Sequence, residues 1–249
     1  MTQNIFSEFP PSDKTAWKNQ AIRDLRGKDF DKSLNSLLWD KIVIEPFYSK
    51  EDVMGLPKLP QSCFEKPSAL PGFSPRTWAN MVSVYPETTN EEILSSLQNG
   101  ASGLILHLTG DENLEEQLNG VIPDYISILV KPKGNPVLVL EVFLNWARKV
   151  ISTESDLKGA FLWSPADLLF EENESWEAAL VVFREVFGAA KDFMDFHPVT
   201  IQFSRYAEAG ATGLDELLFG FGELIDLIAH SGLEPEAVWR RVTFYSAVG

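Results

Sequence analysis

The stretch VTIQFSRYAEAGATGLDELLFGFGELI, residues 199–225, joins a strand-like run to a long apolar helix through a turn of small residues. Similar strand-like runs, most of them strongly apolar, recur after Trp78, with helical segments between them. They cover residues 79–85, 103–108, 125–130, 159–163 and 241–247, in addition to 199–204. Several are apolar at almost every position, as parallel strands covered on both faces are. The alternation predicts βαβ units around a parallel sheet.

We therefore predict an α/β fold with a TIM-type (β/α) barrel, incomplete and of about six βα units, over residues 76–249. A closed barrel of this type needs eight strands, whereas the run 241–247 stops where its helix should begin. An open edge of apolar residues is a liability for a sheet. The sequence leaves three explanations: a truncated chain, an edge covered by another chain, or an atypical closure.

Residues 1–75 predict an N-terminal arm rather than a βα unit. A cap at Ser12 or Asp13 starts a helix that ends near Gly27, and a second short helix is expected over residues 30–37. An alternating run follows at residues 41–48. Residues 48–75 hold many prolines and little periodicity, so we expect this segment to wrap a surface or a partner.

Helix boundaries in the barrel region carry clear signals. Thr89 with Glu92 three residues later predicts a capping box. Pro136 suits the first turn of a helix over residues 136–150, and Ser175 is a cap for the next long helix.

Composition excludes several classes of function. The 249 residues carry a formal net charge of -15, which leaves no basic stripe for nucleic acid or an anionic membrane. A single cysteine, Cys63, rules out an intrachain disulfide. The start lacks signal-peptide features and no run is long enough to span a bilayer. We expect a cytoplasmic protein.

Few residues suggest chemistry. His107, His197 and His230 are scattered, and no metal site is predicted. The pairs Glu171 with Glu172, and Asp215 with Glu216, are expected to be solvated helix ends, where anions favour the N-terminal dipole.

The turn after residue 204 allows two interpretations. Its backbone N–H groups could face an anion at the helix N-terminus, with Arg205 adding charge. The same small residues suit a tight turn under close packing, which physical reasoning favours.

Several segments, in order along the chain, resemble methylmalonyl-CoA mutases, especially their small subunit. They are residues 6–34, 44–53, 86–108 and, most strongly, 208–249, where an E-A-G-A-T turn opens a helix and an R-x-T-F strand follows. The resemblance implies a (β/α) barrel that binds a CoA thioester through its centre and a cobalamin-binding domain after it. Adenosylcobalamin supplies radical chemistry there, interconverting methylmalonyl-CoA and succinyl-CoA.

Departures from the family pattern are equally informative. Ser204 and Arg205 stand where catalytic subunits have a Tyr-His pair, and Arg76 alone keeps a basic group in the segment that holds substrate there. The chain lacks the D-x-H-x-x-G cobalamin motif. The resemblance thus implies no catalytic residue and no cofactor bound by this chain alone.

Three hypotheses of function follow, and we favour the first. The chain is a non-catalytic small-subunit-like protein that pairs with a catalytic large subunit as a heterodimer, or forms a homodimer. Alternatively it is a stand-alone CoA-thioester-binding protein or enzyme, or an unrelated barrel-type enzyme. The candidate ligand-binding residues are Arg205, Gly210, Ala211, Thr212 and Arg76.

Overall fold

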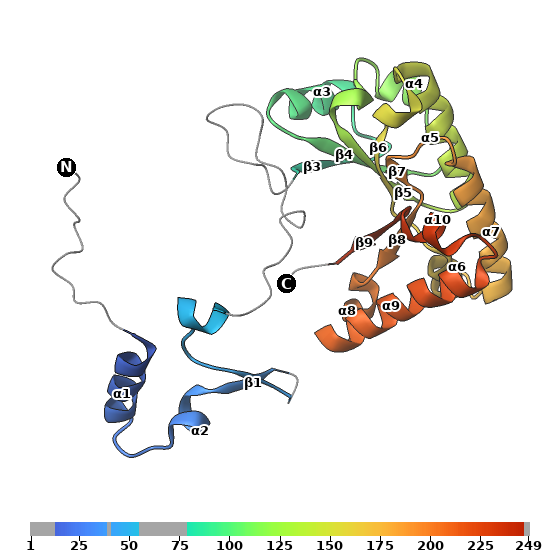
Figure 1. The fold of residues 1–249 in the computed structure, drawn as a ribbon. Coiled ribbons are helices and arrows are strands. Elements are labelled where there is room, and N and C mark those ends of the chain that lie inside the picture. The colour runs from blue at the N-terminus through green and yellow to red at the C-terminus, as the bar shows by residue number, and fades with distance from the viewer. Residues whose placement is uncertain (1–12, 39–40, 55–78, 247–249) are drawn as a thin grey trace. The chain divides into compact units, whose positions relative to one another are not determined.

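The computed structural model describes residues 13–38, 41–54 and 79–246. The chain divides into two compact units, Met1–Pro75 and Arg76–Gly249, which are described one at a time (Figure 1). Within the described ranges, no helix is long and apolar enough to cross a membrane.

The first unit holds two helices, a hairpin and a helical turn. They are α1 (Lys14–Asp24), α2 (Phe30–Leu34), β1 (Ser36–Leu38), β2 (Ile42–Ile44) and η1 (Lys50–Val53). Asp13 caps α1 as predicted, with its carboxylate accepting the Ala16 N–H at 2.6 Å. The predicted helix over residues 30–37 is wrong at its end: α2 stops at Leu34, because Asn35 is extended and β1 pairs antiparallel with the β-branched run of β2. The arm is therefore not purely helical.

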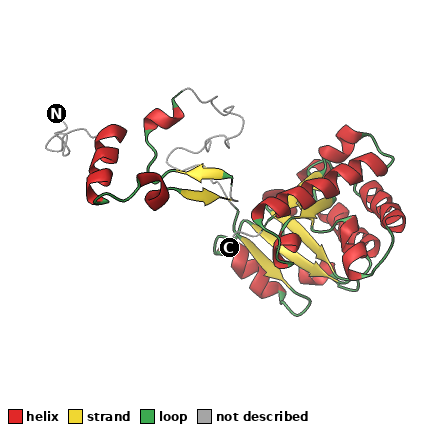
Figure 2. Ribbon diagram, turned by 90° about the horizontal axis from the view of Figure 1, so that it is seen from below, coloured by secondary structure: helices red, strands yellow, loops and turns green. Residues whose placement is uncertain are grey.

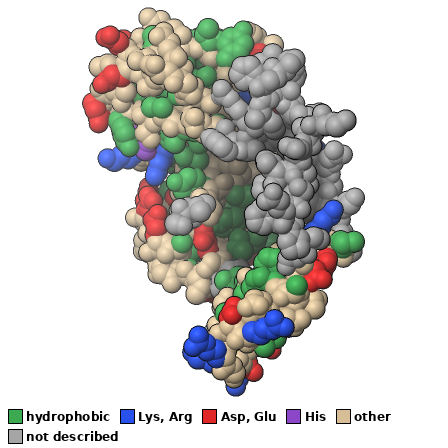
Figure 3. Space-filling view, turned by 90° about the vertical axis from the view of Figure 1, so that its left-hand side faces the viewer, with side chains coloured by type: hydrophobic (Ala, Val, Ile, Leu, Met, Phe, Trp, Pro, Cys, Tyr) green, Lys and Arg blue, Asp and Glu red, His purple; other side chains and the backbone are tan. Residues whose placement is uncertain are grey.

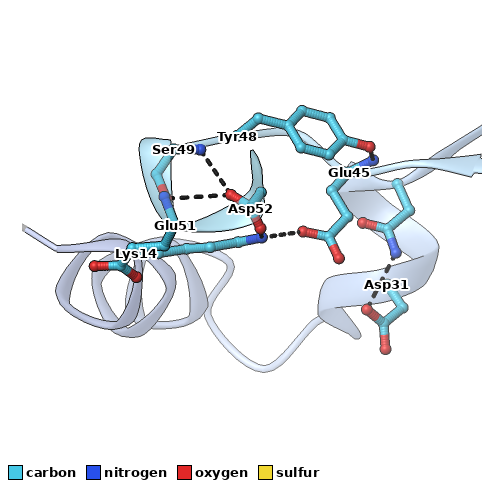
Figure 4. A network of polar contacts seen from close by, with 8 residues as sticks. Lys14, Asp31, Glu45, Tyr48, Ser49, Glu51 and Asp52 are labelled. Carbon is cyan, nitrogen blue, oxygen red and sulfur yellow. Dashed lines mark hydrogen bonds and ion pairs between the residues drawn. The ribbon is translucent and has the colours of Figure 1, made fainter. Parts of the chain in front are cut away.

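Two small clusters hold this unit together. The Trp17 ring stacks on Phe47 with centroids 4.8 Å apart and meets Phe30 edge-on at 6.3 Å. Figure 4 shows the polar cluster, in which Lys14 Nζ donates to Glu45 at 2.6 Å and to Asp52 at 2.5 Å. No residue in its helices and strands is buried.

Parallel strands form the centre of the second unit. The five-stranded sheet runs β3 (Met81–Val84), β4 (Gly103–Leu108), β5 (Ser127–Pro132), β6 (Lys158–Phe161) and β7 (Phe196–His197), and a second parallel pair joins β8 (Val199–Gln202) to β9 (Val242–Tyr245). All six predicted strands are confirmed. Pro198 separates β7 from β8, and Thr200 N donates to Trp163 O at 2.9 Å, which places β8 beside the chain that leaves β6.

The strands follow one another in sequence order, as they do in (β/α) barrels, rather than reversing about a switch point. Within the described residues, β3 and β9 each pair with a single neighbour, so the described strands do not close a barrel. The structure confirms the α/β class and the parallel sheet.

Helices separate most of these strands. They are α3 (Asn90–Gln98), α4 (Leu114–Gln117), α5 (Pro136–Val150), α6 (Pro165–Glu171), α7 (Trp176–Ala189), α8 (Ser204–Glu208), α9 (Gly213–His230) and α10 (Pro235–Trp239), with short turns η3 (Pro123–Tyr125) and η4 (Glu154–Asp156). The predicted capping box of Thr89 and Glu92, the N-terminal Pro136 of α5 and the Ser175 cap of α7 are all confirmed.

The core lies between the sheet and these helices. On β4, Leu104, Leu106 and Leu108 are buried while Ile105 and His107 stay partly exposed, so alternate side chains face the helices. Phe143 of α5 and Phe183 of α7 are fully buried in the same cluster. Figures 1 and 2 show the strands in the middle of the unit, and Figure 1 shows α5 and α7 along one side of them.

Candidate functional site

A cavity of about 750 Å³ opens at the carboxyl ends of the parallel strands. Six strands contribute to its lining, with Tyr85, His107, Lys131, Trp163, Gln202 and Tyr245 at or just beyond the ends of β3, β4, β5, β6, β8 and β9. Carboxyl strand ends are where parallel α/β folds bind ligands, because the loops that follow each strand meet there. This cavity is therefore the candidate functional site.

Arg205 lies on one wall of the cavity and is held by an ion pair. It belongs to α8, which begins immediately after β8, and its Nη2 donates to Oδ1 of Asp167 on α6. Gln202 Nε2 donates to the same carboxylate at 3.1 Å, and the guanidinium lies 5.3 Å from the centre of the Phe170 ring. The Arg205 and Asp167 side chains are only 18% and 13% exposed. Arg205 Nη1 is buried without a partner among the described residues.

Asp167 is the most strongly perturbed carboxyl group of the site. Burial raises its pKa from 3.8 to about 6, while the charge of Arg205 and the Ser164 N–H oppose that rise. The nearby carboxylates of Glu171 and Glu223 add to it. Asp167 therefore exchanges its proton closer to neutral pH than an ordinary aspartate.

A second buried acid lies close by. Glu223 projects from the buried face of α9, and the Tyr206 hydroxyl donates to its Oε2 at 3.1 Å. Burial raises the pKa of Glu223, and burial together with the Glu223 charge raises that of Tyr206. Sequence reasoning missed both Asp167 and Glu223. The sequence did hold a signal for Glu223, because its carboxylate falls on the otherwise apolar face of the helix that includes Gly220 and Leu224.

Comparison with known proteins agrees with the family resemblance noted in the sequence. No family model matches the chain. A methylmalonyl-CoA mutase small subunit from Porphyromonas gingivalis is 23% identical over 259 residues, which cover 99% of this chain and 42% of the relative. The chain is a distant homologue of that small subunit. A second relative of the same name, from Streptomyces virginiae, is 23% identical over 86% of the chain and 37% of its own length.

The chain thus spans about two fifths of the length of the curated relatives that it matches. The P. gingivalis match covers both units, the arm as well as the parallel sheet, since 99% of the chain is aligned.

The ligand-binding residues predicted for this chain do not gather at one place. Arg205 lines the cavity, whereas Gly210, Ala211 and Thr212 do not, and Arg76 lies outside the described residues. Thr212 caps α9 instead, because its Oγ1 accepts the Asp215 N–H and Asp215 reciprocates. A role for these residues in ligand binding stays a prediction.

Two expectations about the turn and its acids need correction. Gly210 does not serve close packing: an added Cβ would meet nothing within 4 Å, and its φ of +95° explains the glycine. Asp215 does lie in the first turn of α9, as expected. Glu171 and Glu172, in contrast, end α6 at its C-terminus, where the helix dipole disfavours anions.

The three histidines of the chain have separate surroundings. His107 stacks on Tyr85 with ring centroids 4.4 Å apart, and burial and Lys131 lower its pKa. His197 is half-buried in β7, and His230 ends α9. Across the described part of the chain, no three His, Cys, Asp or Glu residues could hold a metal ion together.

Replacing Asp167 with asparagine should change how stability depends on pH. The folded pKa of about 6 lies above the ordinary 3.8, so the native fold favours the protonated acid, and that advantage is lost as pH rises through 6. The unfolding free energy of the native protein minus that of Asp167→Asn should fall by about 2 kcal/mol between about pH 4 and about pH 7. Urea titrations followed by tryptophan fluorescence measure it, and a pH-independent difference would contradict the raised pKa.

Proposed function

We propose that this chain acts as a non-catalytic small-subunit-like protein supporting a cobalamin-dependent catalytic subunit that interconverts methylmalonyl-CoA and succinyl-CoA. The observation that carries the proposal is homology over 99% of the chain combined with Ser204 and Arg205 at the expected position of the catalytic Tyr-His pair. Arg205 is tied to Asp167, so it forms part of the fold rather than a free acid or base.

The proposal assigns adenosylcobalamin to the catalytic subunit. Residues 195–200, DFHPVT, come nearest to the D-x-H-x-x-G pattern, but Thr200 replaces the glycine and the segment forms β7 and β8. Thr200 is buried and its hydroxyl donates to Phe161 O at 2.7 Å. A ligand histidine must reach the cofactor, and this histidine is built into a sheet instead.

The arm supports a role in binding another protein. Its hairpin exposes large apolar side chains on both strands, with Leu37 61% exposed and Val43 53% exposed. A two-stranded hairpin is marginal in water by itself, and exposed apolar patches commonly mark interaction sites. Residues 1–75 carry ten Lys and Arg and ten Asp and Glu, so this region has no net charge to repel a partner.

Helix α9 offers a second apolar surface. Its inner face, including Gly220, Leu224 and Leu227, is buried. Its outer face exposes apolar side chains spaced three or four residues apart: Leu214, Leu217, Leu218, Phe221 and Ile225. This spacing places them on one stripe of the helix, as in surfaces that pack against another helix. Both surfaces fit a protein that functions in a complex.

Polar substitution of the hairpin should weaken assembly. The variant Leu37→Ser with Val43→Ser removes exposed apolar area at the proposed interface, so binding to the co-expressed catalytic subunit should fall by about tenfold or more. Size-exclusion chromatography with light scattering and calorimetry measure it. Lys41→Gln, in the same hairpin, is the matched control and should bind normally.

Clear outcomes would count against the proposed role. A chain that stays monomeric beside a correctly folded catalytic subunit would refute the heterodimer. A stable homodimer of the purified chain would favour the homodimer instead. Formation of succinyl-CoA by the purified chain with added adenosylcobalamin would refute the non-catalytic assignment.

The cavity favours small-molecule binding as a second function, although a CoA thioester suits it poorly. Arg205 is already neutralised by Asp167, and Glu171, Glu172 and Glu208 also line the cavity. Near these residues a polyphosphate would meet negative charge. Binding of a CoA thioester that disappears in Arg205→Ala would nevertheless establish the alternative of a CoA-binding protein.

A further inference from the structure

Side chains of opposite charge line different parts of the strand-end cavity. Lys131 is an exposed residue next to the end of β5 and Lys133 directly follows the strand, and both line the cavity. In the described ranges, neither lysine takes part in an ion pair or a side-chain hydrogen bond. Both ammonium groups are therefore available to an anionic group of a ligand.

Unpaired carboxylates line another part of the same cavity. Glu171 and Glu172 end α6, and Glu208 is the last residue of α8. The C-terminal ends of these helices already carry the negative end of the peptide dipoles, so the backbone there disfavours a carboxylate. No described cation pairs with these three glutamates. A cationic group bound there would offset this unfavourable interaction.

The two charged sets are separated rather than mutually neutralised. Lys131 and Lys133 lie at the end of β5 and Glu208 follows β8, and β6 lies between these two strands. The ends of β5 and β8 are therefore about two strand spacings, or about 10 Å, apart. Glu87, after β3, is the acid on the lysine side of this order. Figure 3 shows blue Lys or Arg side chains around a histidine, with red carboxylates below them on the same face.

The cavity as a whole suits an organic molecule. Its lining includes the stacked rings of Tyr85 and His107 on the β3 and β4 side of the lysines, and the buried Trp163 after β6. A volume of about 750 Å³ falls in the range of small-molecule sites. We propose that this cavity binds a zwitterionic small molecule, with its carboxylate at Lys131 and Lys133 and its ammonium group at Glu171, Glu172 and Glu208. The inference does not depend on the proposed partner subunit.

A chain-length-matched set of ligands tests the proposal on the purified chain. The probes are 6-aminohexanoate, hexanoate and hexylamine, which share a six-carbon chain. The first carries both charges, the second only the negative charge and the third only the positive charge. Calorimetry should show 6-aminohexanoate binding at least about tenfold more tightly than either singly charged probe, since each end contributes. Glycine, whose two charges are too close to span the cavity, should bind no better than the single charges.

Charge-neutralising variants assign each end. In Lys131→Gln with Lys133→Gln, 6-aminohexanoate should bind no better than hexylamine; in Glu171→Gln with Glu208→Gln, no better than hexanoate. Lys158→Gln, at the amino end of β6, is the control and should leave binding unchanged. Equal affinity for hexanoate and 6-aminohexanoate, or no binding of 6-aminohexanoate by the native chain, would overturn the proposal.

Discussion

Replacing Arg241 with methionine should lower the free energy of unfolding by about 3 to 5 kcal/mol. Arg241 begins the R-x-T-F strand and is only 5% exposed. Its Nη2 donates to the carbonyl oxygens of Ala190, Phe193 and Phe196 at 2.8 to 2.9 Å, and its guanidinium lies 5.6 Å from the centre of the Phe187 ring. Methionine keeps much of the side-chain volume but leaves three buried carbonyl groups without this donor. Urea unfolding monitored by circular dichroism measures the loss.

The neighbouring Arg240 provides a matched control. It pairs with Glu236 one helical turn away, and both side chains are more than 70% exposed. Exposed pairs at this spacing stabilise by about 0.3 to 0.5 kcal/mol, so Arg240→Met should be nearly neutral. Equal effects of the two substitutions would contradict the anchoring role of Arg241. In that role, Arg241 ties β9 to the end of α7 and to the turn that precedes β7.

This pair of arginines marks a limit of sequence reasoning. Two adjacent arginines before an apolar strand give no sign of which one is buried, because the answer depends on the carbonyl groups of residues 190–196, about 50 positions earlier. The strands themselves could be predicted, since parallel strands covered by helices need long apolar runs. The two-residue β7 was missed because Pro198 interrupts its continuation into β8.

The candidate site, like the strands and the two arginines, could be predicted from the sequence only in part. The carboxyl ends of the six predicted strands locate the cavity once the sheet is parallel, and Arg205 was singled out from sequence. Its partner Asp167 was not, because the serine, proline and aspartate of residues 164–167 have a complete local explanation as a helix cap. Only the tertiary arrangement adds the second role of ion-pair partner. In the arm, residues 36–38 pair with β2 as a strand instead of continuing the predicted helix, because strand pairing outweighs the local helical preference.

Replacing Gly220 with alanine should destabilise the protein by about 3 kcal/mol, at the upper end of typical overpacking effects. Gly220 lies on the buried face of α9, where a Cβ would fall 1.7 Å from two carbons of the Phe203 ring. That ring has little room to move, because it stacks on Phe244 at 5.3 Å and meets Phe221 edge-on at 5.3 Å. The glycine therefore sets the distance at which α9 packs on β8.

Gly222, two residues along the same helix, isolates this effect from helix propensity. A Cβ there would meet nothing within 4 Å, so Gly222→Ala should stabilise the protein by up to about 1 kcal/mol. The two variants make the same chemical change and should differ by about 4 kcal/mol. Thermal and urea unfolding of both proteins measure the difference. Similar stabilities would mean that α9 moves away from Phe203 at little cost, and that the helix is held chiefly by contacts elsewhere on its inner face.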